Sequence, residues 1–277
     1  GASHDQDGPV APLVRTLRLA AAPASALAPL HFVLFNSETD MPLYAQRGSE
    51  LLAQLRQVEV VPDIGEVQTL KNRLWNGPHA LIAWYGALLG HATVGHAMGD
   101  ARVRALLDAV LDQELAPALR RSHPGQRHRL PEFLKTFRER CAHAFKDPCA
   151  RVGRDPLRKL QRDERIVGSL RLVLREGLAA PGLTKGVALA LCHALYHPDA
   201  RQDAESTLLR QRFAEEATAT HLLTWRGDYH GQPYPGLDRQ RDAALLAAIE
   251  RAFAEVQAEL MADEALRPPR DQQALAA

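Results

Sequence analysis

The 277-residue sequence predicts a mainly α-helical protein in which a short β-containing segment precedes the helices. From Glu66 onward, apolar residues recur at three- and four-residue spacing, which is the period of helices with a buried face. Before Glu66, short apolar or alternating runs end at Pro, Asn or Asp, which is typical of strands. Apolar residues make up 46% of the chain and charged residues 24%. These proportions indicate a folded globular protein and exclude a disordered one.

The first part of the chain combines a polar lead with isolated strand signals. Residues 1–13 are rich in Gly, Pro, Ser and Asp, which is typical of a disordered lead or a tag, and residues 14–65 form the β-containing segment. Strands are predicted at 14–19, 31–35 and 58–61, and a short helix at 49–55. Isolated strands do not make a stable sheet. We therefore expect their open edges to pair with another copy of this chain, as a homodimer, or with a separate nucleotide-binding chain.

The remainder is predicted to be one helical domain, residues 66–263, followed by a tail at 264–277. Helical periodicity is strongest at 80–90, 103–119, 166–175, 186–195, 204–223 and 240–262, with Gly and Pro between the segments. No internal repeat is visible.

Several classes of protein are excluded by simple features. No run approaches the roughly 18 uncharged apolar residues of a membrane helix, so no membrane partner is expected. Cys141, Cys149 and Cys192 form no C-x-x-C pair, and no signal peptide opens the chain, which together favour a reducing cytoplasm. No H-E-x-x-H motif accompanies the histidines of the helical part, so no metal site is expected; the nearest candidates are His193, His197 and His221.

Charge is distributed unevenly along the chain. Residues 120–175 contain 16 Lys and Arg against 6 Asp and Glu, a local net charge of +10 in a chain whose net charge is +1. This asymmetry fits an anionic partner, either nucleic acid or a phosphorylated small molecule. The alternative is a set of solvated helix faces whose arginines form ion pairs. No nucleic-acid-binding motif is present, so no nucleic-acid partner is expected.

A first polar cluster lies in residues 71–79, which read KNRLWNGPH. Lys71, Asn76 and His79 stand in the spacing K-x4-N-x2-H. On a helix with about 100° per residue, one broad face carries all three. A desolvated lysine accepts a hydroxyl proton, an asparagine amide donates to a developing oxyanion, and a neutral histidine holds the same oxygen. Alternatively, Gly77-Pro78 divides the segment and Asn76 caps a second helix, in which case Lys71 is a surface lysine and His79 a histidine on an apolar face.

A second cluster lies in residues 151–165, which read RVGRDPLRKLQRDER. Its cations include Arg151, Arg154, Arg158 and Lys159 within nine residues. Arginine forks bind phosphate in bidentate fashion, and a helix beginning at Asp155-Pro156 would add backbone amides to an anion site. A solvated basic face is the alternative.

These two stretches carry a family resemblance. Residues 71–90 (KNRLWNGPHALIAWYGALLG) resemble the start of the helical domain of polyol-specific long-chain dehydrogenases, and RVGRDPLRKL with DERIVG resembles their mannitol-1-phosphate 5-dehydrogenase branch. The resemblance implies a helical substrate domain of the 6-phosphogluconate-dehydrogenase C-terminal type. It extends from about Val14 to at least Gly177, and Ala142-His143 stands where the family usually has Asn-Pro.

The resemblance also implies roles for particular residues. A Lys, an Asn and a His at this spacing form the family's catalytic group, which makes Lys71 the general base, Asn76 the group that polarises the oxygen and His79 the group that orients it. An Arg and a Lys eight apart contact substrate hydroxyls, which matches Arg151 and Lys159.

Two further arginines, Arg154 and Arg158, resemble the phosphate-specific branch, and we take them as the groups that neutralise a substrate phosphate. The implied reaction interconverts a hexitol phosphate and fructose 6-phosphate with NAD. The implied ligand is a phosphorylated sugar or sugar alcohol.

The cofactor is the main departure from the family. Its members carry NAD in an N-terminal Rossmann domain, whereas this sequence has no G-x-G and no strand–glycine loop–helix pattern. NAD is therefore expected from the family, but no binding site for it is expected in this chain. The alternative function is a non-catalytic module of the same descent that binds a sugar phosphate or a protein.

Overall fold

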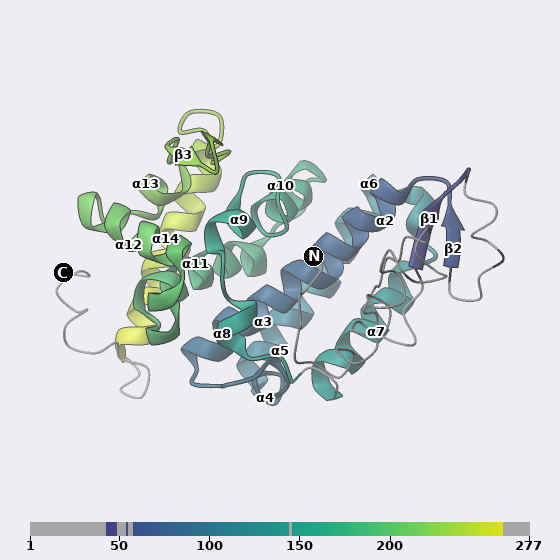
Figure 1. Cartoon of the computed structure of the whole chain (residues 1–277), viewed down its shortest axis with the longest axis horizontal. Coiled ribbons are helices and arrows are strands. Elements are labelled where there is room, and N and C mark those ends of the chain that lie inside the picture. The colour runs from purple at the N-terminus through teal and green to yellow at the C-terminus, as the bar shows by residue number, and fades with distance from the viewer. Residues whose placement is uncertain (1–42, 49–53, 55–57, 144–145, 263–277) are drawn as a thin grey trace, which may run out of the picture. The chain divides into compact units, whose positions relative to one another are not determined.

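A computed structural model describes residues 43–48, 54, 58–143 and 146–262 (Figure 1). The chain divides into two compact units, residues 1–64 and 65–277, and each is considered by itself. The described residues are predominantly helical, as the sequence predicts.

The first unit contributes a pair of short strands. Strand β1 (Leu43–Gln46) pairs in parallel with β2 (Val58–Val61), and Leu43 lies opposite Val58. The prediction of a strand at 58–61 is confirmed. The strands predicted at 14–19 and 31–35 lie outside the described residues, as does the helix predicted at 49–55 except for Gln54.

Helices follow one another through the second unit, beginning with α2 at the boundary. Two segments, η2 and η3, are π-helical, while η4 and η5 are 3₁₀ turns. The elements in order are α2 (Ile64–Lys71), η2 (Asn72–Asn76), α3 (Gly77–Leu88), α4 (Val94–Ala97), α5 (Ala101–Asp108), η3 (Ala109–Leu115), α6 (Ala116–Ser122), η4 (Pro124–Gln126), α7 (Leu130–His143), α8 (Cys149–Val152), α9 (Pro156–Leu160), α10 (Val167–Arg175), α11 (Pro181–Tyr196), η5 (Pro198–Gln202), α12 (Ala204–Glu215), α13 (Ala219–Leu223), the two-residue antiparallel strands β3 (Asp228–Tyr229) and β4 (Gln232–Pro233), and α14 (Ala243–Ala262).

Helices α3 and α11 form the centre of this unit, and α14 packs along α11 (Figure 1). Both central helices are apolar on nearly every side, which is the pattern of helices surrounded by protein. The helices approach closely at Gly186, where an added Cβ would meet the Leu81 side chain at 2.4 Å. A larger residue at this position would require the Leu81 side chain to move.

A buried carboxylate holds the start of α11. Glu114 projects from η3 and accepts hydrogen bonds from the backbone amides of Gly182 at 2.6 Å and Leu183 at 2.9 Å. Burial raises the pKa of this carboxyl, and the two amides oppose the rise. The contact satisfies two of the four amides that the first turn of a helix leaves without partners.

Most predicted helical segments are present, with two differences. The segment 204–223 divides into α12 and α13, because Thr218 accepts a hydrogen bond from the amide of His221 at 3.0 Å and begins a new helix. Helix α7 was not predicted. Its buried residues, Leu130, Leu134, Phe137 and Cys141, do follow helical spacing, but the many charges between them hide the pattern.

Candidate functional site

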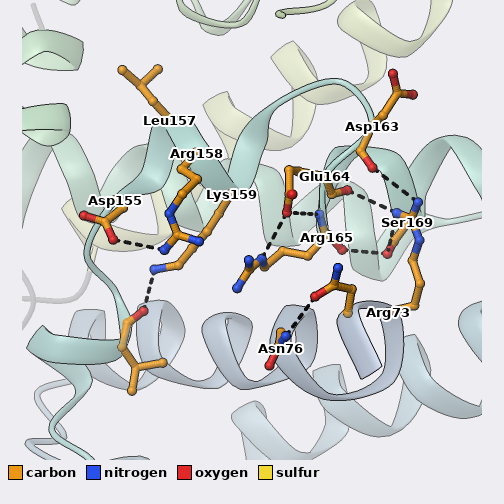
Figure 2. A network of polar contacts seen from close by, with 12 residues as sticks. Arg73, Asn76, Asp155, Leu157, Arg158, Lys159, Asp163, Glu164, Arg165 and Ser169 are labelled. Atoms are coloured by element: carbon orange, nitrogen blue, oxygen red, sulfur yellow. Dashed lines mark hydrogen bonds and ion pairs between the residues drawn. The ribbon is translucent and has the colours of Figure 1, made fainter. Parts of the chain in front are cut away.

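The segment that carries the first polar cluster is one continuous helix with a π-helical insert. The amide of Gly77 donates to the carbonyl oxygen of Asn72, an i→i+5 bond, and Asn76 has helical backbone angles. The alternative in which Asn76 caps a second helix is therefore wrong. Its side-chain Nδ2 instead donates to Oδ1 of Asn72 at 2.8 Å (Figure 2). Single π-helical turns inside α-helices are frequent at functional sites.

The insert changes how the three predicted catalytic residues are arranged. A π-turn holds more residues than the 3.6 of an α-helix, so the regular 100° spacing does not apply between Lys71 and His79. Lys71 is exposed at the end of α2 and makes no side-chain hydrogen bond or ion pair with the described residues, whereas Asn76 and His79 are half-buried. The expectation that Lys71 is desolvated is wrong for this structure.

His79 is an exception in its helix, because every other residue of α3 is buried. Its Nε2 lies 3.8 Å from Oδ2 of Asp147, and its side chain is 15% exposed. Burial lowers the pKa of His79 to about 4, against the opposing effect of Asp147, so the imidazole is neutral at pH 7. A neutral imidazole is the form that the predicted orienting role requires.

Asp147 is the residue that joins the two polar clusters. Its Oδ2 faces His79 and its Oδ1 accepts a hydrogen bond from Nη2 of Arg151, one helical turn further along the chain. The sequence patterns did not single out this aspartate. Its position four residues before an arginine at the start of a helix was the signal available.

Lys159 is the desolvated lysine of this region. It is 5% exposed, and its Nζ donates to the carbonyl oxygens of Val152, at 2.7 Å, and Arg154. The ammonium lies 5.7 Å from the centre of the Trp84 ring. Burial, and secondarily the charge of Arg158, lowers the pKa of Lys159 to about 8. The burial that we expected of Lys71 is therefore found in Lys159.

The two arginines predicted to bind phosphate have partners within the chain. Nη2 of Arg158 donates to Asp155 at 3.0 Å (Figure 2). The backbone amide of Arg158 donates to the carboxylate of Glu205 at 3.0 Å. Arg154 is exposed, and its Nε donates to the carbonyl oxygen of Arg151 at 3.3 Å. The predicted helix does begin at Pro156, but it is five residues long and a carboxylate takes one of its first amides.

Two further arginines lie near these side chains, Arg73 in η2 and Arg165 in the turn before α10. Arg73 donates from Nη1 to the carbonyl oxygen of Glu164 at 3.1 Å and to Ser169 Oγ at 3.2 Å, which ties the turn to η2. In Figure 2 the guanidinium of Arg165 extends from this turn to a place between Asn76 and Lys159. Arg165 is the last residue of the second cluster, and the sequence analysis gave it no role.

Ion pairs occupy much of the remaining basic segment. Arg138 contacts Asp112 at 2.7 Å, and Arg162 and Arg171 share Asp242 at 3.6 and 3.9 Å. These arginines fit the alternative interpretation, in which the local positive charge is balanced by acidic residues elsewhere in the chain.

A cavity of about 540 Å³ lies apart from the predicted residues. Its lining combines Tyr85, three charged side chains and apolar residues of α11, α14 and the end of α3 (Arg102, Lys185, Glu259, Leu89, Leu189, Val256, Leu260 and Ala262), and none of the seven predicted site residues lines it. The described part of the chain contains no group of three or more His, Cys, Asp or Glu residues that could hold a metal ion. His193 and His197 stack with ring centres 5.0 Å apart, and burial lowers the pKa of His193 to about 3.

Residues 63–221 match the model of the mannitol dehydrogenase C-terminal domain. This match covers more than half of the chain and contains both polar clusters. The chain belongs to the mannitol dehydrogenase C-terminal domain family. Its mainly helical fold is that of this domain.

Two curated relatives of this mannitol dehydrogenase domain carry the name mannitol-1-phosphate 5-dehydrogenase. The protein from Caldanaerobacter subterraneus subsp. tengcongensis is 26% identical over 212 residues, which is 75% of this chain and 50% of the relative. The protein from Aspergillus fumigatus is 32% identical over 144 residues, which is 52% of this chain and 37% of the relative. The matched region thus spans half or less of these relatives.

Two solved structures share the fold of this mannitol dehydrogenase domain. One is Pseudomonas fluorescens mannitol 2-dehydrogenase in a ternary complex with NAD and D-mannitol, with a TM-score of 0.59 and 20% identity over 73% of this chain and 40% of that one. The other is a substrate-free D-sorbitol dehydrogenase, with a TM-score of 0.53 and 17% identity over 76% of this chain and 41% of that one.

No described helix is both long enough and apolar enough to span a membrane.

Proposed function

We propose that this chain is the substrate-binding and catalytic domain of a mannitol-1-phosphate 5-dehydrogenase-like enzyme, which interconverts a hexitol phosphate and fructose 6-phosphate. The observation that carries the proposal is Asp147, whose carboxylate lies against both His79 and Arg151 and so joins the two clusters. The names of the curated relatives support the same substrate class.

The chemistry of the proposal is distributed over the first cluster. Lys71 accepts the proton of the substrate hydroxyl as the alcohol is oxidised, and it returns a proton in the reverse direction. The Asn76 amide stabilises the negative charge that develops on the same oxygen, and neutral His79 orients it. Because Lys71 is exposed here, efficient proton transfer requires that water be excluded from this face during the reaction.

The second cluster holds the rest of the substrate in this proposal. Arg151 and Lys159 contact the sugar hydroxyls, and Arg154 and Arg158 supply positive charge for the phosphate. Asp147 keeps Arg151 beside His79, so that hydroxyl binding and oxygen orientation are coupled.

NAD accepts the hydride in the family reaction, and the Pseudomonas fluorescens mannitol 2-dehydrogenase was solved in complex with it. The described residues do not fit this cofactor. Their only parallel strand pair, β1–β2, carries no glycine-rich loop, and the sequence has no G-x-G. We therefore assign no part of NAD binding to these residues.

Ligand binding tests the proposal directly. Isothermal titration of the purified chain with fructose 6-phosphate should show saturable binding, and ligand should raise the melting temperature. His79→Gln should weaken this binding, whereas the matched variant His128→Gln, at an exposed position on the surface, should not. Equal affinity for inorganic phosphate and fructose 6-phosphate would contradict a sugar-phosphate site.

The exposure of Lys71 favours a second candidate, a non-catalytic module that binds a sugar phosphate or a protein. The two candidates differ in turnover. In the natural full-length protein, NADH-dependent reduction of fructose 6-phosphate that is lost in Lys71→Met supports the enzyme. Binding without turnover supports the module.

Assembly and location complete the proposal. We propose that strand edges of the first unit pair with another copy of the chain or with a nucleotide-binding chain, which light scattering after size-exclusion chromatography would detect as a species larger than a monomer. We also propose a cytoplasmic location, because Cys141, Cys149 and Cys192 are free and buried.

A further inference from the structure

Arg165 occupies a position that is fixed by its backbone. Its carbonyl oxygen accepts a hydrogen bond from Ser169 Oγ at 2.6 Å, and it approaches Gly77 so closely that an added Cβ there would lie 2.9 Å from it. Arg73 ties the preceding residues to η2 from the other side. The turn that carries Arg165 is therefore held against the helix that carries Asn76.

The side chain of Arg165 is more enclosed than the arginines predicted to bind phosphate. It is 16% exposed, compared with 42% for Arg158, and Arg154 is exposed. Within the described residues, its side-chain hydrogen bonds use only Nε, which donates to Glu164 at 3.3 Å. Both terminal nitrogens of its fork are thus available to a ligand, and a planar fork matches the geometry of phosphate oxygens.

Charge around this fork favours an anion. Figure 2 places the guanidinium between Asn76 and Lys159, and the charge of Arg165 helps to lower the pKa of Lys159. The Lys159 ammonium is bound to carbonyl oxygens rather than to a carboxylate. Because a neighbouring pair of partly desolvated cations is costly, an anion that contacts both is stabilised.

We propose that Arg165 is the principal phosphate-binding residue of this site, with its terminal guanidinium nitrogens on the phosphate of the sugar substrate beside Lys159. This proposal rests on the proposed function and deepens it, because it assigns specificity for the phosphorylated substrate to the last residue of the second cluster, which had no predicted role. Arg154 and Arg158 then contribute charge at longer range.

The test compares the affinities of fructose 6-phosphate and D-fructose in matched variants. Arg165→Gln should raise the Kd for fructose 6-phosphate by about 10- to 100-fold, the range of a hydrogen bond between charged groups. The Kd for D-fructose should change less than about twofold. Arg165→Lys, which keeps the charge but loses the fork, should give an intermediate Kd. Arg158→Gln should have a smaller effect than Arg165→Gln, and Arg251→Gln on α14 should have none.

The outcomes separate this proposal from the function on which it rests. If the wild-type chain does not bind fructose 6-phosphate, the proposed function fails. If it does, and Arg165→Gln binds as tightly as the wild type, only the role of Arg165 is overturned. An equal loss for D-fructose also overturns it, because the residue then acts on the sugar or on the fold. Circular dichroism shows whether Arg165→Gln is folded. If it is not, Arg165→Lys becomes the test, and a wild-type Kd for fructose 6-phosphate in that variant would overturn the role of the guanidinium.

Discussion

Helix α3 and the α8–α9 segment hold their site residues in opposite ways. Apart from His79, all of α3 is buried, so packing is the main contact that fixes its position. Helices α8 and α9 are four and five residues long, and their polar side chains bind one another and nearby carbonyl oxygens. A hydrogen bond from Trp84 Nε1 to the carbonyl oxygen of Gly153, at 2.8 Å, joins the two regions. The comparison indicates that α3 supplies a rigid frame, whereas the geometry of the charged segment depends on which groups carry protons.

The largest expected effect on stability comes from removing the Trp84 side chain, which connects α3 to the α8–α9 segment. Trp84 is fully buried, and Trp84→Ala should lower the free energy of unfolding by about 3–5 kcal/mol, since a large cavity forms beside α8. Chemical denaturation measures the loss. Leu174→Ala, at a residue that is 44% exposed, should change it by less than about 0.5 kcal/mol. If Trp84→Ala costs no more than this control, α3 is not the frame that we describe.

A pH-dependent effect of intermediate size is expected from Lys159 in the charged segment. Its pKa is about 8 in the folded chain and is taken as 10.5 when unfolded. Between these values the unfolded chain binds more protons, so this residue makes the free energy of unfolding rise with pH, by about 3 kcal/mol in total. We expect this rise from pH 8 to 10.5 to be missing in Lys159→Met.

Denaturation at several pH values in that window measures the slope. Lys135→Met, at an exposed lysine of α7, controls for the loss of a lysine and should keep the wild-type slope. Parallel slopes for the wild type and Lys159→Met would show that the buried ammonium does not make the charged segment sensitive to pH.

The smallest expected effect concerns the contact between the two regions at Asp147. The pKa of His79 is about 4, and the negative charge of Asp147 raises it against burial. Asp147→Asn should therefore lower the pKa of His79 further. The change is measured by following the imidazole signals of His79 by NMR as pH is varied, with His128→Gln and His79→Gln spectra to assign them. A rise in the pKa would contradict the arrangement in which the carboxylate faces the imidazole.

Local sequence patterns predicted much of the helical unit. The periodicity that predicted 166–175 and 186–195 corresponds to α10 and α11, because an apolar stripe at helical spacing can be buried in only one kind of element. The start of α9 at Asp155-Pro156 was also predictable from the fixed backbone angle of proline. Helix α7 was missed, since its charged residues outnumber the apolar positions that mark its buried face.

The candidate site was predictable only in part. Residue types and spacing predicted both clusters. They did not predict which lysine is buried, so desolvation was assigned to Lys71 instead of Lys159. Asp147 was not predicted as a site residue, and Arg165 lay in the second cluster without a predicted role. The π-helical insert at Asn72–Asn76 was not predicted from the sequence either.

By itself, the sequence determined most of the helical segments and the two stretches that hold the polar residues of the candidate site. Tertiary structure alone decided which lysine is buried, which carboxylate faces His79 and which arginine keeps a free fork. The physical reason is range. Helical periodicity and capping act over a few neighbouring residues, whereas desolvation and ion pairing depend on groups such as His79 and Asp147 that lie far apart in the chain.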